Sequence, residues 1–206
     1  MGATSGIGRC ALDEAVSRGL PVRAFARGAD SLSGVESVEA MPGDALNPED
    51  VRAALSGVRA VVYALGIRER LAMLWEKETL FSNSTRILVD EMANAKTTRL
   101  VVVTGFGAGR SKFAMSKLEK MGHRAVLGRP YADKDRQEEM IMASDLDWTI
   151  ARPVILTKGA RTTDYKVLRD PSKWRNGLIS RKSVAHYLID AVEQSLDLQS
   201  DVVLSR

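Results

Sequence analysis

The chain has 206 residues, of which 45% are hydrophobic and 27% charged, and this length and composition predict one compact α/β domain. Its net charge of +4 comes from residues spread along the whole chain, which argues against a nucleic-acid-binding surface. No apolar run approaches the roughly 20 residues of a membrane span, and a single cysteine, Cys10, excludes an internal disulfide framework, so we expect a cytoplasmic protein with no nucleic-acid partner, no membrane partner and no metal site.

The chain opens with a glycine-rich turn, Gly2-Ala3-Thr4-Ser5-Gly6-Ile7-Gly8, followed by a predicted helix over residues 7–18. A pyrophosphate needs backbone N–H groups that point at it and no side chains in the way. Glycines supply the tight turn, and the helix N-terminus supplies positive partial charge. Three glycines alone are a weak signal, because a flexible loop before any helix would look alike. We assign this turn to cofactor binding through Gly2, Thr4, Ser5, Gly6, Ile7 and Gly8.

Only Met1 precedes Gly2, whereas a dinucleotide-binding sheet places its central strand before the glycine turn. We therefore expect the first strand to be missing or truncated. A sheet without that strand would expose two inner strand edges and contain an unfilled slot.

Residues 21–27 predict a short strand, and Arg27 stands at its carboxyl end, near the ~20-residue offset at which a ribose contact is expected. A guanidinium there favours a 2′-phosphate, through bidentate charge-assisted hydrogen bonds. We therefore expect NADP as the cofactor, with NAD as the alternative. The competing interpretation of Arg27 is a solvated arginine at a strand end.

Residues 37–41 predict the next strand, and Asp44 follows it, where the carboxylate either accepts from the adenine amino group or caps a turn. Asn47 is the expected N-cap of a helix with Pro48 in its first turn. Residues 60–66 form an apolar run typical of a strand buried on both faces. At the ends of these segments we add Ala45, Ala64, Leu65 and Gly66 to the cofactor-binding set.

A helix is predicted over residues 71–95, and residues 99–105 form the clearest buried strand. Thr104 ends that strand, at the edge where ligands bind in open parallel sheets. Its hydroxyl is a candidate for catalysis or for orienting a substrate, and the alternative is a β-branched residue that merely ends a strand.

The remaining segments are a lid or packed helix over 111–128, a helix over 131–144, a strand over 147–151, a short extended segment at 178–179, a helix over 181–194 capped by Ser180, and an edge strand over 201–204. Strands that alternate with helices predict a doubly wound parallel sheet with helices on both faces. We expect a single domain over residues 1–206.

Several stretches together resemble the atypical short-chain dehydrogenase/reductases, in particular their NmrA-like and flavin/biliverdin reductase-like members. The stretches that carry the resemblance are 2–8, Arg27, Gly43-Asp44, 64–66, 101–105, 131–138, 147–153 and 179–185. Their order along nearly the whole chain is more specific than any one motif. The resemblance implies an NAD(P)-binding Rossmann domain, cofactor roles for Gly2, Gly6, Gly8, Arg27 and Asp44, and a small C-terminal substrate region over about 153–206.

The catalytic pattern of this family has a Tyr four residues before a Lys that lowers the pKa of the phenol. Lys134 matches that lysine, but Pro130 stands four residues earlier and the tyrosine is Tyr131. One helical position is about 100° of rotation, so Tyr131 would point elsewhere if the helix has already begun there. The serine and histidine of the flavin-reductase members correspond here to Gly105 and Ile155. We take Thr104, Tyr131 and Lys134 as the catalytic candidates.

Two functions fit this sequence. The first is an NADP(H)-dependent oxidoreductase with a small-molecule acceptor: a flavin or quinone needs little acid catalysis, whereas a carbonyl needs a proton donor. The second is a non-catalytic NADP(H)-binding sensor that acts through a protein partner. The position of Tyr131 separates them, because a tyrosine within hydrogen-bond distance of the nicotinamide ribose or of an acceptor favours the enzyme and one that faces solvent favours the sensor.

Overall fold

The computed structural model describes residues 1–66 and 79–206, without the side chains of 117–118 and 122–129. The helices are α1 (Gly6–Ser17), α2 (Pro48–Leu55), α3 (Leu80–Ala95), α4 (Lys117–Met142) and α5 (Arg181–Glu193), with short 3-10 helices at Ala29–Leu32, Gly109–Ala114 and Pro171–Lys173. The strands are β1 (Val22–Ala26), β2 (Val38–Pro42), β3 (Ala60–Tyr63), β4 (Arg99–Val103), β5 (Asp147–Pro153), β6 (Ile155–Thr157), β7 (Lys166–Leu168), β8 (Leu178–Ser180) and β9 (Ser200–Ser205).

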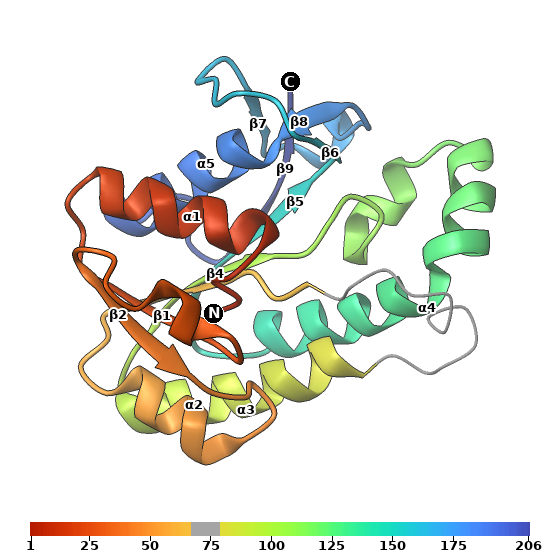
Figure 1. The fold of residues 1–206 in the computed structure, drawn as a ribbon. Coiled ribbons are helices and arrows are strands. Elements are labelled where there is room, and N and C mark those ends of the chain that lie inside the picture. Colours follow the sequence, from red (N-terminus) through yellow and green to blue (C-terminus); the bar gives the residue numbers. More distant parts are fainter. Residues whose placement is uncertain (67–78) are drawn as a thin grey trace.

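The central sheet has the strand order β3-β4-β5-β9-β7, and β1 pairs separately with β2. All of these pairs are parallel except that of β7 with β9. A third, small sheet joins β6 to β8. Helix α1 packs beside α5, whereas α2, α3 and α4 pack in succession along the opposite face (Figure 1). This arrangement confirms the predicted α/β doubly wound fold.

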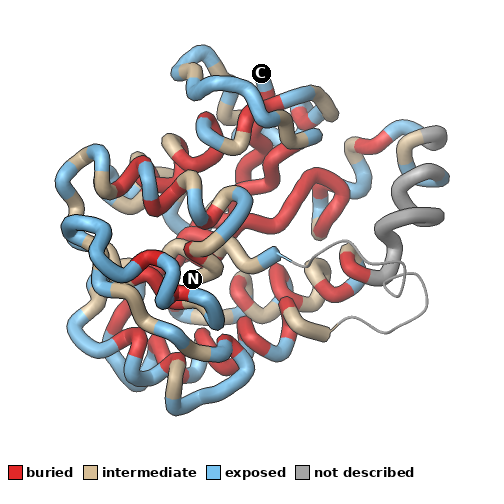
Figure 2. The backbone as a smooth tube through the Cα atoms, viewed as in Figure 1, coloured by how far each residue is buried: buried red, intermediate tan, exposed pale blue. Residues whose placement is uncertain are grey.

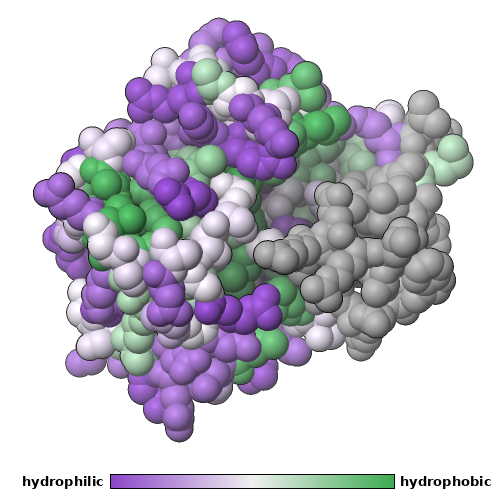
Figure 3. All heavy atoms as spheres, viewed as in Figure 1, coloured by the Kyte–Doolittle hydropathy of each residue, from purple (hydrophilic) through white to green (hydrophobic). Residues whose placement is uncertain are grey.

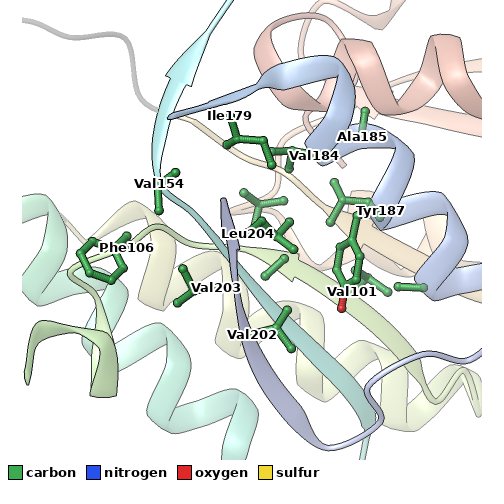
Figure 4. Close-up of a cluster of buried hydrophobic side chains, with 14 of the residues drawn as sticks. Val101, Phe106, Val154, Ile179, Val184, Ala185, Tyr187, Val202, Val203 and Leu204 are labelled. Carbon is green, nitrogen blue, oxygen red and sulfur yellow. The ribbon is translucent and has the colours of Figure 1, made fainter. Parts of the chain in front are cut away.

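The main core lies between α5 and the central strands. Val101 of β4, Ala151 of β5 and Val202 and Leu204 of β9 belong to one buried cluster with Val184 and Leu188 of α5, whereas Val203 points to the opposite side of β9 (Figure 4). Burial in Figure 2 is accordingly concentrated along the middle of the sheet. Helices cover both faces of these strands, which is why their sequences are continuously apolar rather than alternating.

Two helices begin at the capping residues that the sequence predicts. The side chain of Asn47 accepts a hydrogen bond from the Glu49 N–H (3.0 Å) at the start of α2. Ser180 accepts one from the Ser183 N–H (3.0 Å) at the start of α5. Each cap satisfies a backbone donor that has no partner within its own helix.

Two predicted elements are corrected by the structure. The strand near the C-terminus is not at an edge, because β9 lies between β5 and β7. Residues 117–142 form one helix, α4, with Pro130 inside it, rather than a helix that begins at 131. Of the predicted helix 71–95, residues 71–78 lie outside the described residues, and the rest corresponds to α3.

The predicted slot is present in the sheet. Among the described strands, β1 bonds only to β2 and β3 only to β4, so the two sheets are separate at the position between β1 and β3. A cavity of about 1190 Å³ lies there, and the backbone of Met1 and Gly2 reaches into one end of it.

Candidate functional site

The glycine turn is held tightly against the ends of β1 and β3. The Gly2 N–H donates to the Phe25 carbonyl oxygen (2.9 Å). A Cβ on Gly2 would stand 2.6 Å from the Ala64 carbonyl oxygen, and one on Gly8 would stand 2.1 Å from the Gly2 carbonyl oxygen. No side chain fits at either position, so both glycines are required for the turn to close on itself.

Gly6 differs from these two glycines. Its φ is +57°, which favours glycine, but no protein atom lies within 4 Å of the position that a Cβ would take. Gly6 begins α1, and the N-cap residue Ser5 makes no side-chain cap. The first turn of α1 also contains no acidic residue. The result is an open cradle at the positive end of a helix dipole, which suits a diphosphate.

The other cofactor-binding candidates lie at the carboxyl ends of neighbouring strands. Arg27 is exposed directly after β1, and no hydrogen bond of its guanidinium to another described residue is found. The Ala64 N–H donates to the Met1 carbonyl oxygen (3.1 Å), which places 64–66 beside the glycine turn. Figure 3 shows the surface hollowed near the N-terminal end of α1.

Three members of the cofactor-binding set have structural roles as well. One carboxylate oxygen of Asp44 accepts from the Leu46 N–H (3.0 Å), so Asp44 does stabilise a turn. Ala45 is buried in the core beside α2. The side chain of Ile7 also packs on the core, which leaves its backbone N–H, rather than its side chain, for a ligand.

The three catalytic candidates converge at the carboxyl end of β4. The Lys134 ammonium group donates to the Thr104 carbonyl oxygen (2.7 Å). The Tyr131 hydroxyl lies against Gly105, where an added Cβ would be 2.6 Å from it. Tyr131 lies inside helix α4, and its hydroxyl nevertheless points to the end of β4. The expectation that Tyr131 would point elsewhere if the helix had already begun there is therefore wrong.

Burial sets the protonation of this cluster. It lowers the pKa of Lys134 from 10.5 to about 8, against the opposing effect of the Glu138 and Asp133 carboxylates. It raises the pKa of Tyr131 to about 12, and the negative charge of Glu138 adds to that shift. Lys134 thus does not produce the lowered phenol pKa that the family pattern implies.

Behind this cluster lies a buried charge network that sequence reasoning did not find. The Thr104 hydroxyl donates to Glu138 (2.6 Å), and Glu138 accepts two hydrogen bonds from Arg152 (2.7 and 3.0 Å). Arg152 also donates to Asp201 (2.5 Å), which Arg110 binds from the other side. The network joins α4 to β4, β5 and β9, and the only sequence signal for it is an arginine inside an apolar strand.

The chain matches a family of nucleotide-binding proteins. A family model described as NAD(P)H-binding matches residues 2–195. The chain therefore belongs to this NAD(P)H-binding family. That membership agrees with the general class expected from the sequence, an NAD(P)H-dependent oxidoreductase of the atypical short-chain dehydrogenase/reductase type.

Solved structures share the fold. The anaerobillin reductase ChuY of Escherichia coli O157:H7 is 24% identical, with a TM-score of 0.81 over 99% of this chain and 94% of that one. A short-chain dehydrogenase/reductase of Veillonella parvula, solved in complex with NADP, is 16% identical, with a TM-score of 0.82 over 100% and 92% of the two chains. The oxidoreductase YlbE of Lactococcus lactis is 16% identical, with a TM-score of 0.83 over 100% and 89%. A search of curated proteins gave no match.

Among the described residues, no helix combines the length and the apolar character needed to cross a bilayer.

Proposed function

We propose that this protein is an NADP(H)-dependent oxidoreductase whose acceptor is a small conjugated molecule such as a flavin or a quinone. The bound dinucleotide supplies the hydride. The observation that carries the proposal is the convergence of Thr104, Tyr131 and Lys134 at the end of β4, along the same sheet edge as the glycine turn. The position of Tyr131 supports the enzyme, because its hydroxyl lies against Gly105 at the end of β4.

The protonation of the site favours a conjugated acceptor over a simple carbonyl. Tyr131, with a pKa of about 12, is a weak acid, and the Thr104 hydroxyl is committed to Glu138. A carbonyl needs a proton as the hydride arrives, whereas a flavin or quinone delocalises the added charge and takes its proton from water. The similarity to an anaerobillin reductase supports a reductase with an organic acceptor.

In this proposal the protein residues bind the dinucleotide and orient it and the acceptor. The backbone of the 2–8 turn holds the diphosphate, and Arg27 holds the 2′-phosphate, so that NADPH is preferred over NADH. Asp44 and 64–66 border the adenosine half. Lys134 carries positive charge beside the end of β4 below pH 8 and fixes the strand end against which the acceptor stacks.

The test is a turnover assay. The protein is incubated with NADPH and a flavin, a quinone or an aldehyde, and the reduced-nicotinamide absorbance is followed. We expect oxidation of NADPH with the flavin or quinone, and a rate with the aldehyde at least tenfold lower. A faster rate with the aldehyde would reject the conjugated acceptor.

A second candidate, a non-catalytic NADP(H)-binding sensor with a protein partner, is favoured by the raised pKa of Tyr131. The same assay separates the two functions. NADPH binding without turnover of any acceptor would support the sensor and reject the enzyme.

A further inference from the structure

Strand β5 ends in a proline although it lies inside the sheet. It is bonded to β4 on one side and to β9 on the other. Proline has no backbone N–H, and within sheets it is found almost only on edge strands, at first residues or at bulges. Pro153 is buried and is the last residue of β5. It therefore removes one hydrogen bond from the ladder of an interior strand.

The neighbouring hydrogen bonds show which bond is missing. The Thr104 N–H donates to the Ala151 carbonyl oxygen (3.0 Å), and the Phe106 N–H donates to the Pro153 carbonyl oxygen (2.9 Å). In a parallel ladder a residue donates to one residue of the adjacent strand and accepts from the residue two positions further on. The donor for the Thr104 carbonyl oxygen would accordingly be the N–H of residue 153. Because Pro153 has none, this oxygen has no backbone donor in β5.

The Lys134 ammonium group takes the place of that donor. It donates to the Thr104 carbonyl oxygen at 2.7 Å. Such a charge-assisted hydrogen bond is roughly twice as strong as one between neutral groups. Among the residues that the structure describes, this oxygen is the one hydrogen-bond partner found for the ammonium group. The position of the lysine head group therefore depends on an acceptor that Pro153 leaves free.

The other groups that face Lys134 do not fix its head group in the same way. Glu138 and Asp133, on the same helix, favour its charged form, whereas burial lowers its pKa to about 8. The ammonium group lies 4.6 Å from the centre of the Phe81 ring of α3 and 6.0 Å from that of Tyr131. A hydrogen bond to the charged form favours that form. The free carbonyl oxygen at the end of β4 thus keeps the lysine charged to a higher pH than burial alone would allow.

We propose that Pro153 is a positioning residue for Lys134: by withholding a backbone donor, it leaves the Thr104 carbonyl oxygen to hold the ammonium group at the carboxyl end of β4. An N–H at residue 153 would occupy one of the two lone pairs of that oxygen and weaken its bond to the lysine. The consequence for cofactor binding and reaction rests on the proposed function, because it requires the dinucleotide and the acceptor to lie at this edge of the sheet.

The first experiment restores the missing donor with Pro153→Ala. The titration of Lys134 is followed by NMR of its side-chain Cε in the protein without cofactor. We expect the midpoint, about 8 in the unaltered protein, to move by about half a pH unit or more. It falls if the ammonium group stays beside Phe81 with a weaker hydrogen bond, and it rises if the lysine is released to water. An unchanged midpoint would overturn the proposal.

Two further variants separate the N–H from the loss of a proline ring. Pro42→Ala replaces another proline that ends a strand, β2, and should leave the midpoint of Lys134 unchanged. An equal shift in this variant would mean that the effect is not specific to residue 153, and would reject the proposal. Pro153→Val supplies the same N–H on a residue that favours strands. It should reproduce the shift, and it takes the place of Pro153→Ala if that variant does not fold.

A double-mutant cycle tests whether Pro153 acts through Lys134. The affinity for NADPH is measured at pH 7 for the unaltered protein, Pro153→Ala, Lys134→Met and the double variant. Pro153→Ala should weaken binding about threefold or more, and should cause no further loss when Lys134 is already replaced. Equal losses in both backgrounds would show that Pro153 acts independently of the lysine, and would reject the proposal. If the unaltered protein bound no NADPH, the proposed function would fail, whereas the NMR titration, which needs no cofactor, would still decide the role of Pro153.

Discussion

The Lys134 ammonium group and the Thr104 carbonyl oxygen, 2.7 Å apart, join helix α4 to the carboxyl end of β4. The lysine is also 4.6 Å from the centre of the Phe81 ring, so α3 helps to enclose it. This enclosure lowers the pKa of Lys134 to about 8 and makes the charge at the site sensitive to pH near neutrality.

The first prediction concerns this titration. NADPH is an anion, so its affinity should fall as pH rises through about 8 and Lys134 loses its charge. Lys134→Met should bind NADPH more weakly at pH 7 and show a flatter profile from pH 7 to 9, whereas Lys134→Arg should stay charged across that range. The measurement is a titration of NADPH binding at several pH values.

Stability should change in the opposite sense. The folded-state pKa of Lys134 is lowered from 10.5 to about 8, so the unfolded chain binds more protons between these values. The contribution of Lys134 to the free energy of unfolding therefore rises with pH over this window. A denaturant titration at pH 8 and pH 10 checks the sign, and Lys134→Met should remove the difference.

The second prediction concerns Arg27. Arg27→Ala should weaken NADPH binding by roughly tenfold or more, because charge-assisted hydrogen bonds contribute about 1.5–3 kcal/mol. NADH, which has no 2′-phosphate, should bind within about twofold of its original affinity. Arg86→Ala, which removes an exposed arginine from α3, is the matched control. Equal losses for the two cofactors would contradict the phosphate role.

The third prediction tests the packing of the glycine turn. Gly8→Ala places a Cβ 2.1 Å from the Gly2 carbonyl oxygen, and this clash should destabilise the fold by about 1–3 kcal/mol. NADPH binding should fall at least tenfold, because the cradle can no longer close. Gly28→Ala, where a Cβ meets open space, should leave the unfolding temperature unchanged. A stable Gly8→Ala variant with normal affinity would show that the turn is not the binding element.

The features that were predictable from sequence are set by short stretches of chain. The glycine turn, the caps at Asn47 and Ser180, and the apolar runs of β3 and β4 each depend on a few neighbouring residues.

The features that sequence did not predict depend on contacts between distant residues. β9 resembles an edge strand by its position near the C-terminus, but β7 pairs with its outer side through residues whose pattern is too short to recognise. Likewise, separate segments were predicted over 111–128 and 131–144, whereas α4 runs continuously through Pro130 and places the Tyr131 hydroxyl against Gly105. The roles of the cofactor-binding and catalytic residues stay predictions until a complex is examined.

The last prediction concerns the buried network behind the site. Arg152 is completely buried, and Glu138 supplies two of its hydrogen bonds. Glu138→Gln removes the negative charge and leaves the guanidinium partly uncompensated, which should lower the free energy of unfolding by about 3 kcal/mol or more. Glu139→Gln, on the exposed side of the same helix, should change it by less than about 0.5 kcal/mol. Denaturant unfolding measures both variants. Glu138 also accepts a hydrogen bond from the Thr104 hydroxyl, so the loss of the Glu138 carboxylate should disturb the end of β4. If Glu138→Gln were as stable as Glu139→Gln, the Asp201 carboxylate alone would be enough to compensate the charge of Arg152.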